Sequence, residues 1–411
     1  MTAGASVAKR QSDVRGHNLA LVLHQVHLRG EISRAALTEL TGLNRSTIGT
    51  LVGDLRDLGL VLDSRPTGGT KVGRPSHLVT ARADGPFTIA VAIDVGRVVV
   101  ALVGLGGAIR GRTEVGLGSD IRPDRAVEVI DALASRLERG LPRGARPLGV
   151  GVSLPGTVQS SDGLVGSAPN FGWVDVPMAE MLADRMTRRH PGLGVRVGND
   201  ADLGARAEHL RGAGRQVDDL VYLCGTVGVG AGIIVGGVPL PTARGHGGEL
   251  GHMVVQLDGP RCRCGGRGCF EALVGGEALC ALAGSAYRDG VDPAARVLTD
   301  ARAGQPDALG AVRVVAERIG TGLATIVRIL DPRMIVVGGR PGQIYQLCRD
   351  DAERAMSRHL IAADSQVSIA SPGLGGDSSL FGAAELAFDA LVDRTLQAGW
   401  LGSGSGSGSG R

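Results

Sequence analysis

Three cysteines and one histidine stand close together in the second half of the chain. Cys262 follows His252 by ten residues and opens the pattern Cys-x-Cys-x4-Cys, which continues with Cys264 and Cys269. Thiolates and imidazole are the donors of tetrahedral zinc sites, and the intervening glycines let the backbone wrap around an ion. Four protein ligands leave no open position for a substrate. We therefore predict structural Zn²⁺; the alternative is three incidental, redox-active thiols.

The composition indicates a folded intracellular protein of two or three domains. Hydrophobic residues make up 43% of the 411 residues and aromatic residues only 2%, so the cores must be aliphatic. The sequence has no apolar run of membrane-spanning length and no secretory segment, which predicts a cytoplasmic protein, nucleoid-associated when bound to DNA. A clustered cysteine motif in such a protein indicates metal binding before a disulfide.

Positive charge is concentrated at the N-terminus. Residues 1–82 contain eleven Lys/Arg and six Asp/Glu, whereas the whole chain has a formal net charge of only +3. The remainder of the chain is therefore slightly acidic. A basic segment on a faintly acidic body suggests that this segment alone meets a polyanion, although a solvated basic surface would show the same charge.

The basic segment has the pattern of a winged helix-turn-helix. A helix is predicted over 18–29, a second one capped by Ser33, and a third one capped by Asn44 after a break at Gly42. In the third helix apolar residues recur at spacings of three and four, and Gly59 suits its C-terminal end. Two strands, at 60–63 and 77–81, would form the wing. An ordinary three-helix packing module is the alternative.

Polar and basic side chains then fall where such a module meets double-stranded DNA. The second of the two turn-linked helices supplies base and phosphate contacts, and Arg74 at the wing tip suits a minor groove. The candidate DNA-binding residues are Arg34, Arg45, Ser46, Thr47, Thr50, Lys71 and Arg74.

Beyond residue 86 the sequence indicates an α/β body. Strand-like runs at 87–96, 97–105, 147–154, 195–200, 220–235 and 333–339 alternate with longer helical segments such as 125–140 and 311–330. We predict four segments: a flexible tail over 1–16, the winged helix-turn-helix over 17–82, a two-lobed body over 86–398, and an appended Gly/Ser linker over 402–411.

Several motifs together resemble the ROK family, whose name stands for repressors, open reading frames and kinases. The motifs are ISRAALTELTGLNRSTIG, VGRPS, VAIDVG, GVSLPGTV, SAPNFGW, VGNDAD, GGELGH, CRCGGRGCFEA and LDPRMIVVGG. The resemblance extends from about Asn18 to about Val392, and the cysteine motif joined to GELGH is its most specific part. It implies an actin-like (ribonuclease H-like) fold with two lobes and a sugar bound in the cleft between them.

The resemblance also implies a set of sugar-binding residues. Asn199 and Asp200 match the Asn-Asp pair that contacts sugar hydroxyls, and the Asp is the general base of the family's kinases. His252 would serve twice, with one ring nitrogen on zinc and the other toward a hydroxyl. The implied sugar-binding residues are Gly156, Thr157, Asn170, Asn199, Asp200, Glu249, His252 and Glu271.

Two loops that hold ATP phosphates in the family's kinases depart from their usual patterns here. Asp94-Val95-Gly96-Arg97-Val98 stands where Asp-x-Gly-Gly-Thr is typical, and Thr226-Val227-Gly228-Val229-Gly230 stands where Gly-Thr-Gly-x-Gly is typical. Side chains replace the bare backbone that must approach phosphate. We therefore expect no catalytic residue and no kinase activity, so that Asp200 would be a base only if the protein were a kinase.

These observations predict a sugar-responsive regulator of transcription, with repression relieved by sugar as the default. It would bind a double-stranded DNA operator as a homodimer or homotetramer, take a small-molecule sugar or sugar derivative as effector, and have no membrane partner. Two alternatives remain open. One is a sugar kinase, or a bifunctional regulator and kinase, that acts on a hexose or N-acetylhexosamine; the other is an interaction protein that does not bind DNA.

Overall fold

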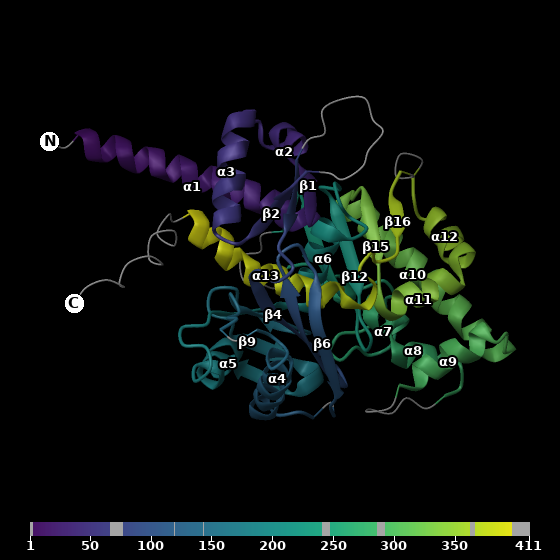
Figure 1. The fold of residues 1–411 in the computed structure, drawn as a ribbon. Helices are drawn as coiled ribbons and strands as arrows, with labels where there is room; N and C mark the ends of the chain where they lie inside the picture. Colours follow the sequence, from purple (N-terminus) through teal and green to yellow (C-terminus); the bar gives the residue numbers. More distant parts are fainter. Residues whose placement is uncertain are drawn as a thin grey trace.

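The computed structural model describes residues 3–65, 77–118, 120–142, 144–240, 247–285, 292–361 and 366–396. The chain forms an N-terminal head and two α/β lobes (Figure 1). None of the helices in these ranges is long and apolar enough to cross a membrane. The predicted fold class is confirmed.

The head consists of three helices and a small antiparallel sheet. Its elements are α1 (Ala3–Arg29), β1 (Glu31–Ser33), α2 (Arg34–Thr41), α3 (Arg45–Asp57), β2 (Val61–Ser64) and β3 (Leu78–Ala81). Hydrogen bonds join the strands in the order β1-β3-β2. The hairpin of β2 and β3 is the predicted one, and β1 is an additional edge strand that the sequence pattern did not indicate.

The predicted caps of the head helices are confirmed. The Ser33 hydroxyl accepts a hydrogen bond from the backbone N–H of Ala36, and the Asn44 side chain accepts one from the N–H of Thr47. Gly42 ends α2 with φ of 69°, a left-handed conformation that favours glycine. These caps fix the two helices on either side of the tight turn.

The prediction of a flexible tail over 1–16 needs correction, because α1 already begins at Ala3. No proline interrupts residues 3–16, and most of the residue types there favour or tolerate a helix, so the helix that packs against the head continues toward the N-terminus.

The first lobe is built on a five-stranded sheet in the order β11-β7-β4-β5-β6. Its strands are β4 (Phe87–Asp94), β5 (Arg97–Gly104), β6 (Ile109–Gly116), β7 (Val150–Leu154) and β11 (Val195–Asn199). Helices α4 (Pro123–Glu138) and α5 (Met178–Met186) share an aliphatic core with one face of the sheet. A small sheet of β8 (Thr157–Val158), β9 (Val165–Ala168) and β10 (Trp173–Val176) follows β7.

The second lobe repeats this plan with the strand order β14-β13-β12-β15-β16. Its strands are β12 (Leu220–Cys224), β13 (Gly230–Val235), β14 (Val238–Pro239), β15 (Met334–Val337) and β16 (Ser368–Ala370). Its helices are α7 (Phe270–Val274), α8 (Gly276–Leu282), α9 (Pro293–Arg302), α10 (Pro306–Leu330), α11 (Gly339–Leu347) and α12 (Arg349–Ser357). The 25-residue helix α10 supplies much of the buried aliphatic surface.

Two helices tie the parts together. Helix α6 (Asp200–Arg211) packs against β13 of the second lobe and against α13 (Ser378–Leu396). Helix α13 covers the sheet of the first lobe and also contacts α1, so it lies between the head and that lobe (Figure 1). One continuous core therefore contains Leu51 and Leu55 of the head, Ala90 of β4 and Phe388 of α13. The head therefore shares a core with α13 and one face of the first-lobe sheet, while the other face packs against α4 and α5 in a core of its own.

Candidate functional site

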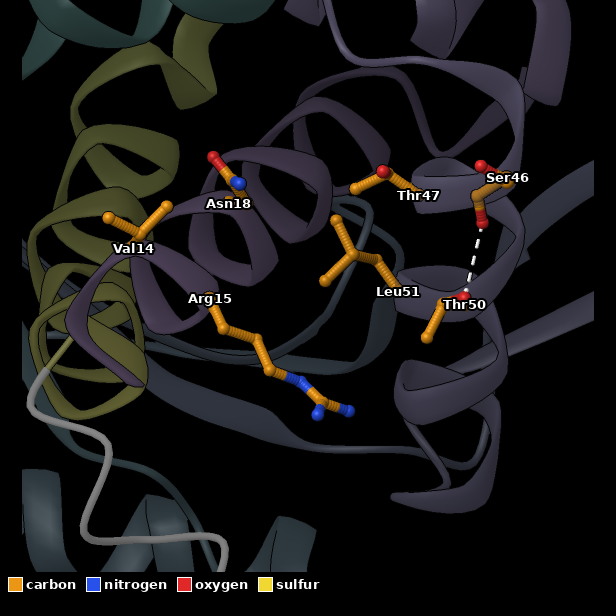
Figure 2. A pocket seen from close by; sticks show the side chains of 7 residues that line it. All are labelled: Val14, Arg15, Asn18, Ser46, Thr47, Thr50 and Leu51. Carbon is orange, nitrogen blue, oxygen red and sulfur yellow. Dashed lines mark hydrogen bonds between the residues drawn. The ribbon is translucent and has the colours of Figure 1, made fainter. Parts of the chain in front are cut away.

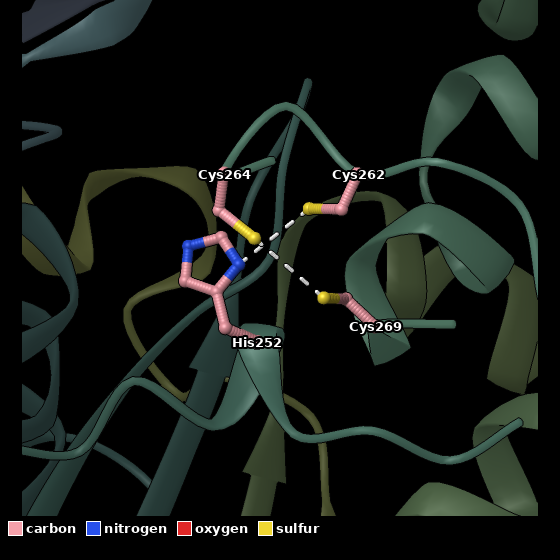
Figure 3. Close-up of side chains that lie close together, drawn as sticks. All are labelled: His252, Cys262, Cys264 and Cys269. Atoms are coloured by element: carbon pink, nitrogen blue, oxygen red, sulfur yellow. Dashed lines mark hydrogen bonds between the residues drawn. The ribbon is translucent and has the colours of Figure 1, made fainter. Parts of the chain in front are cut away.

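The predicted metal ligands come together in space. One ligand atom from each of His252, Cys262, Cys264 and Cys269 lies within 4.8 Å of all the others (Figure 3). The distance from Cys262 Sγ to His252 Nδ1 is 3.6 Å, and the distance from Cys264 Sγ to Cys269 Sγ is 3.7 Å. Around tetrahedral zinc, ligand geometry places an imidazole nitrogen and a sulfur about 3.6 Å apart and two sulfurs about 3.8 Å apart. The donor set and its spacing fit Zn²⁺.

A short hairpin presents the three thiols. The N–H of Cys262 donates to the carbonyl of Gly266, and the N–H of Gly265 donates back to the carbonyl of Cys262. Gly268, with φ of 68°, passes so close to Gln256 that a Cβ would lie 1.6 Å from the Gln256 carbonyl oxygen. Only glycine fits there, which explains why the motif is rich in this residue.

The thiols need a cation to ionise together. Burial raises the pKa of the Cys262 thiol to about 12, while a backbone hydrogen bond from Gly266 lowers the pKa of the Cys264 thiol. A bound divalent cation stabilises thiolates directly and would overcome the desolvation of Cys262.

The Asn-Asp pair stands at the junction of the lobes. Asn199 ends β11 and caps α6, since its side-chain oxygen accepts from the N–H groups of Ala201 and Asp202. Its side-chain amide donates to the carbonyl of Gly156 over 2.9 Å. This bond places the loop after β7 beside the first turn of α6, as the predicted site requires.

Asp200, the first residue of α6, has an unusual carboxyl group. Burial and the nearby carboxylate of Asp94 at the end of β4 raise its pKa to about 7. Two carboxyl groups that approach in a desolvated site cannot both ionise freely, and polar ligands that donate hydrogen bonds relieve such a site. Sugar hydroxyls are donors of this kind.

Further carboxylates of the site lie toward the second lobe. Burial and the carboxylate of Glu249 raise the pKa of Asp202 to about 6, and Glu249 Oε2 is 3.9 Å from His252 Nε2. That separation is too long for a hydrogen bond but suits a ligand hydroxyl near both groups. His252 thus turns Nδ1 to the thiols and Nε2 to Glu249.

Glu271 lies between the metal cluster and the loop after β12. Its Oε1 is 3.4 Å from Cys262 Sγ, and its Oε2 accepts from the N–H of Val229 over 3.1 Å. Thr157, in β8, and Asn170, in the 3-10 turn after β9, lie on the first-lobe side, where Gly156 packs against Ala168. No hydrogen bond among the described residues joins Asn170 to the rest of the set.

The two loops with altered phosphate motifs have their own side-chain contacts. Arg97 folds back so that its Nε is 2.9 Å from Asp94 Oδ2, and Gly96 between them has φ of 90°. In the second loop the Val229 N–H is already bonded to Glu271. A Cβ on Gly228 would lie 2.1 Å from that same carboxylate. Both loops therefore pack against acidic side chains.

In the head, four of the candidate DNA residues lie in the first half of α3. Arg45, Ser46 and Thr50 are exposed, and Thr47 is half-buried. An open groove separates α3 from α1 and is lined by Val14, Arg15, Asn18, Ser46, Thr47, Thr50 and Leu51 (Figure 2). The hydroxyl of Thr50 donates to the Ser46 carbonyl, and Arg15 reaches across the groove to pair with Asp54 at 2.7 Å.

The remaining basic candidates differ in their surroundings. Arg34, at the start of α2, is ion-paired with Asp63 of β2 and is only partly exposed, which suits orientation of the helix against the wing better than a free contact. Lys71 and Arg74 lie outside the described residues, so their predicted place at the wing tip stays a prediction.

Sequence reasoning missed several residues around the site. Asp94 was noted only as part of a phosphate loop, and Asp202 and Cys224 were not noted as site residues. Burial and the neighbouring Asp200 carboxyl raise the pKa of the Cys224 thiol well above its usual value. A position at the carboxyl end of a buried strand, shared by Asp94 and Cys224, was the available signal.

Comparison with known proteins defines the class. The sequence profile of the ROK family matches residues 88–390. The chain belongs to the ROK family, and the resemblance deduced from the motifs is confirmed.

Its relatives include regulators and kinases. A putative xylose repressor of Caldicellulosiruptor sp. (strain Rt8B.4) is 27% identical over 350 residues, which cover 82% of this chain and 86% of the relative. The solved structure of a ROK family transcriptional regulator, a homologue of the E. coli MLC protein, has a TM-score of 0.73 at 23% identity and covers 93% of this chain and 99% of its own. The solved structure of a ROK family glucokinase of Streptomyces griseus, in complex with glucose and AMPPNP, has a TM-score of 0.62 at 29% identity. The match covers 74% of this chain and 99% of the glucokinase chain.

Proposed function

We propose that this protein is a sugar-responsive, DNA-binding regulator of transcription, most simply a repressor of carbohydrate-metabolism genes. The observation that carries the proposal is that one chain contains both a helix-turn-helix and a polar site between the lobes. One continuous hydrophobic core connects the head with the elements that form this site. The glucokinase structure covers 74% of the chain and the regulator structure 93%. The regulator structure thus matches a larger part of the chain than the glucokinase structure, which favours a regulator over a kinase.

The proposal that the protein binds DNA is based on the structure of the head. Arg45, Ser46 and Thr50 stand at the exposed start of a capped helix that follows a tight turn, which is the geometry of a recognition helix in a major groove. Two heads on a symmetric homodimer or homotetramer would read a pseudo-palindromic operator. Such a protein works in the cytoplasm, where bacterial DNA lies.

The proposal that the protein binds a sugar is based on several hydrogen-bond acceptors that lie close together at the junction of the lobes. Asn199 and Asp200 come from the first lobe, and Glu249 and His252 come from the second. Gly156, Thr157, Asn170 and Glu271 complete the proposed set. Charged acceptors in a desolvated site bind neutral hydroxyls strongly.

Zinc is the proposed ion of the four-ligand cluster. When bound, it would supply structural stability and fix the tautomer of His252, since Nδ1 as a ligand leaves Nε2–H free to donate. The chain's own residues do the recognition: Glu271 and Glu249 flank this hairpin and would accept from the sugar.

A kinase or bifunctional protein is the second candidate, because Asp200 has a pKa of about 7 and matches the residue that the family's kinases use as general base. The ion pair of Arg97 with Asp94 and the engagement of the Val229 N–H by Glu271 oppose it. Both contacts occupy groups that would otherwise meet the phosphates and their metal ion.

A ligand screen tests the proposal that the protein binds a sugar. Zinc-loaded protein is melted with D-xylose, D-glucose, N-acetylglucosamine and their 6-phosphates where these exist, because a ligand of the folded state raises the melting temperature. We expect at least one sugar to raise it in the wild type and not in Glu249→Gln. No shift with any sugar would contradict the proposal that the protein binds a sugar.

Two further measurements separate the function classes. Retention of duplex DNA should fall steeply with salt, as expected for a protein that neutralises several phosphates, and should be lost in Arg45→Ala. ATP turnover with each bound sugar should stay at background. Turnover that disappears in Asp200→Asn would establish the kinase instead, and salt-independent or absent DNA retention would exclude a regulator.

A further inference from the structure

Helix α6 joins the proposed sugar site to the base of the head. It begins with Asp200, in the inter-lobe site, and ends with Arg211. Twelve helical residues span about 18 Å. The two ends of one short helix therefore reach two functional regions.

The first turn of the helix is held by direct backbone contact, and α13 packs against the helix. A Cβ on Gly382 of α13 would lie 2.0 Å from the carbonyl oxygen of Leu203, and a Cβ on Gly232 of β13 would lie 2.3 Å from that of Ala201. Such close packing leaves no slack for bending. A displacement of the first turn is passed to the last turn.

At its far end, Arg211 contacts three separate segments. Its Nε donates to Glu385 Oε1 of α13 over 2.6 Å, and its Nη1 reaches the carbonyl oxygens of Leu28, in α1, and Gly106, in the turn after β5, at 3.4 and 3.2 Å. Its Nη2 lies 2.7 Å from His27 Nε2. One guanidinium thus connects α6 to the last turn of the helix that carries the head.

The cluster of Arg211, His27 and Glu385 is buried. The exposed fractions of the three side chains are 8%, 6% and 3%. His27 Nδ1 accepts from the Gly106 N–H, so Nε2 carries the ring proton and donates to Glu385 over 3.0 Å. Arg211 Nη2, which is also a donor, packs against this nitrogen without forming a hydrogen bond to it. Within the cluster, Arg211 and Glu385 form a buried ion pair at 2.6 Å. Buried pairs of this kind are costly to break, so they favour discrete arrangements over gradual distortion.

Helix α1 continues from this cluster into the head. Val22 and Val26 of α1 share the core with Leu51 and Leu55 of α3. Since α1 and α3 pack as one unit, a shift at His27 and Leu28 is passed on to α3.

We propose that α6 is the link through which occupancy of the inter-lobe site reorients the head, with Arg211 as the residue that couples α6 to α1. This inference rests on the proposed function for its biological meaning. The physical link itself concerns only α6 and α1.

Matched variants isolate the coupling residue. Arg211→Gln removes the ion pair with Glu385 and the contacts to the two carbonyl oxygens, and Arg211→Lys keeps the charge near Glu385 but has a shorter reach to the two carbonyls. Arg206→Gln is the control, because Arg206 lies on the same helix and pairs with Asp389 of the same partner helix, at 2.8 and 2.5 Å. Should Arg211→Gln not fold, Arg211→Lys carries the test.

The readout is amide hydrogen exchange in residues 17–29, in the full-length zinc-loaded protein. The inter-lobe site is perturbed in two ways: by a saturating sugar from the screen, and without ligand by Asp200→Asn. We expect either perturbation to change exchange in this segment by about threefold or more in the wild type and in Arg206→Gln, and by less than about 1.5-fold in both Arg211 variants. Sugar should still raise the melting temperature of the variants.

The same variants are measured for DNA binding with and without sugar. A coupled system typically changes affinity by about 5–150-fold, and this factor should fall below about 2 in the Arg211 variants. The link would be overturned if the Arg211 variants showed the same changes in hydrogen exchange and DNA affinity as the wild type. It would also be overturned if Asp200→Asn, in an otherwise wild-type protein, left hydrogen exchange in residues 17–29 unchanged. A lack of any sugar effect on melting would count against the proposed function alone, because the Asp200→Asn comparison still decides the link.

Discussion

Asp200 should reduce the stability of the protein at neutral and alkaline pH. Its pKa is about 7 in the folded protein and 3.8 in the unfolded chain. Between these values the folded state binds more protons than the unfolded state, so stability falls as pH rises through this window. The sign is opposite to that of a salt-bridged carboxylate, whose pKa is lowered by folding.

The size of the effect on the free energy of unfolding follows from the difference between the two pKa values of Asp200. Each pKa unit corresponds to about 1.4 kcal/mol, which gives an upper bound of about 4 kcal/mol at pH 8. Partial solvent access and local relaxation reduce this to about 1–2 kcal/mol. Asparagine cannot ionise and is nearly isosteric. Asp200→Asn should therefore be more stable than the wild type by about 1–2 kcal/mol at pH 8, and more than half of this advantage should vanish by pH 5.

Thermal melts of both proteins at pH 8 and pH 5, at matched ionic strength, measure the difference. An increase of about 2–6 °C in melting temperature is expected for Asp200→Asn at pH 8. Asp57→Asn is the control, because the Asp57 side chain is 69% exposed in the head. A variant that is no more stable than the wild type at pH 8, or equally stabilised at both pH values, would refute the reasoning.

Three other outcomes are expected. Wild-type protein should contain one zinc ion per chain by elemental analysis, and Cys262→Ser should lose both the ion and the sugar-induced melting shift; retention of either would contradict a metal-supported site. Asn44→Ala should lower stability by about 1 kcal/mol through loss of the cap on α3, seen as an earlier melt together with weaker DNA retention. Sugar affinity measured by calorimetry should fall up to about tenfold per pH unit below pH 7, since an ionised Asp200 is the stronger acceptor, and a flat profile from pH 5.5 to 8 would exclude that role.

Local sequence signals predicted the parts of the fold that depend on neighbouring residues. Ser33 and Asn44 cap helices because a short side-chain oxygen reaches N–H groups three residues ahead, a relation visible in sequence. The metal ligands were likewise visible, because three of the four lie within eight residues. Edge strand β1 escaped notice because its three residues acquire strand geometry only by pairing with β3.

Long-range encounters could not be predicted in this way. Arg211 and Glu385 are 174 positions apart, and each would be an ordinary exposed residue on an isolated helix. The approach of Asp94 to Asp200 likewise depends on how β4 and β11 lie in one sheet, two strands apart. Pattern analysis finds such residues one by one, but only the fold shows that they share an environment.

The scarcity of aromatic residues bears on how a signal crosses the molecule. Where bulky side chains are few, elements approach until their backbones touch: a Cβ on Gly151 of β7 would lie 1.8 Å from the Ala383 carbonyl oxygen, just as Gly382 approaches Leu203. Strand β7, α13 and α6 therefore form a stack whose spacing is set by hard backbone contact. A stack of this kind moves as a body, whereas a core of flexible side chains would absorb a small displacement by changing rotamers. Close glycine and alanine packing thus makes α6 a suitable rigid connection between the inter-lobe polar site and α1, the helix against which α3 packs.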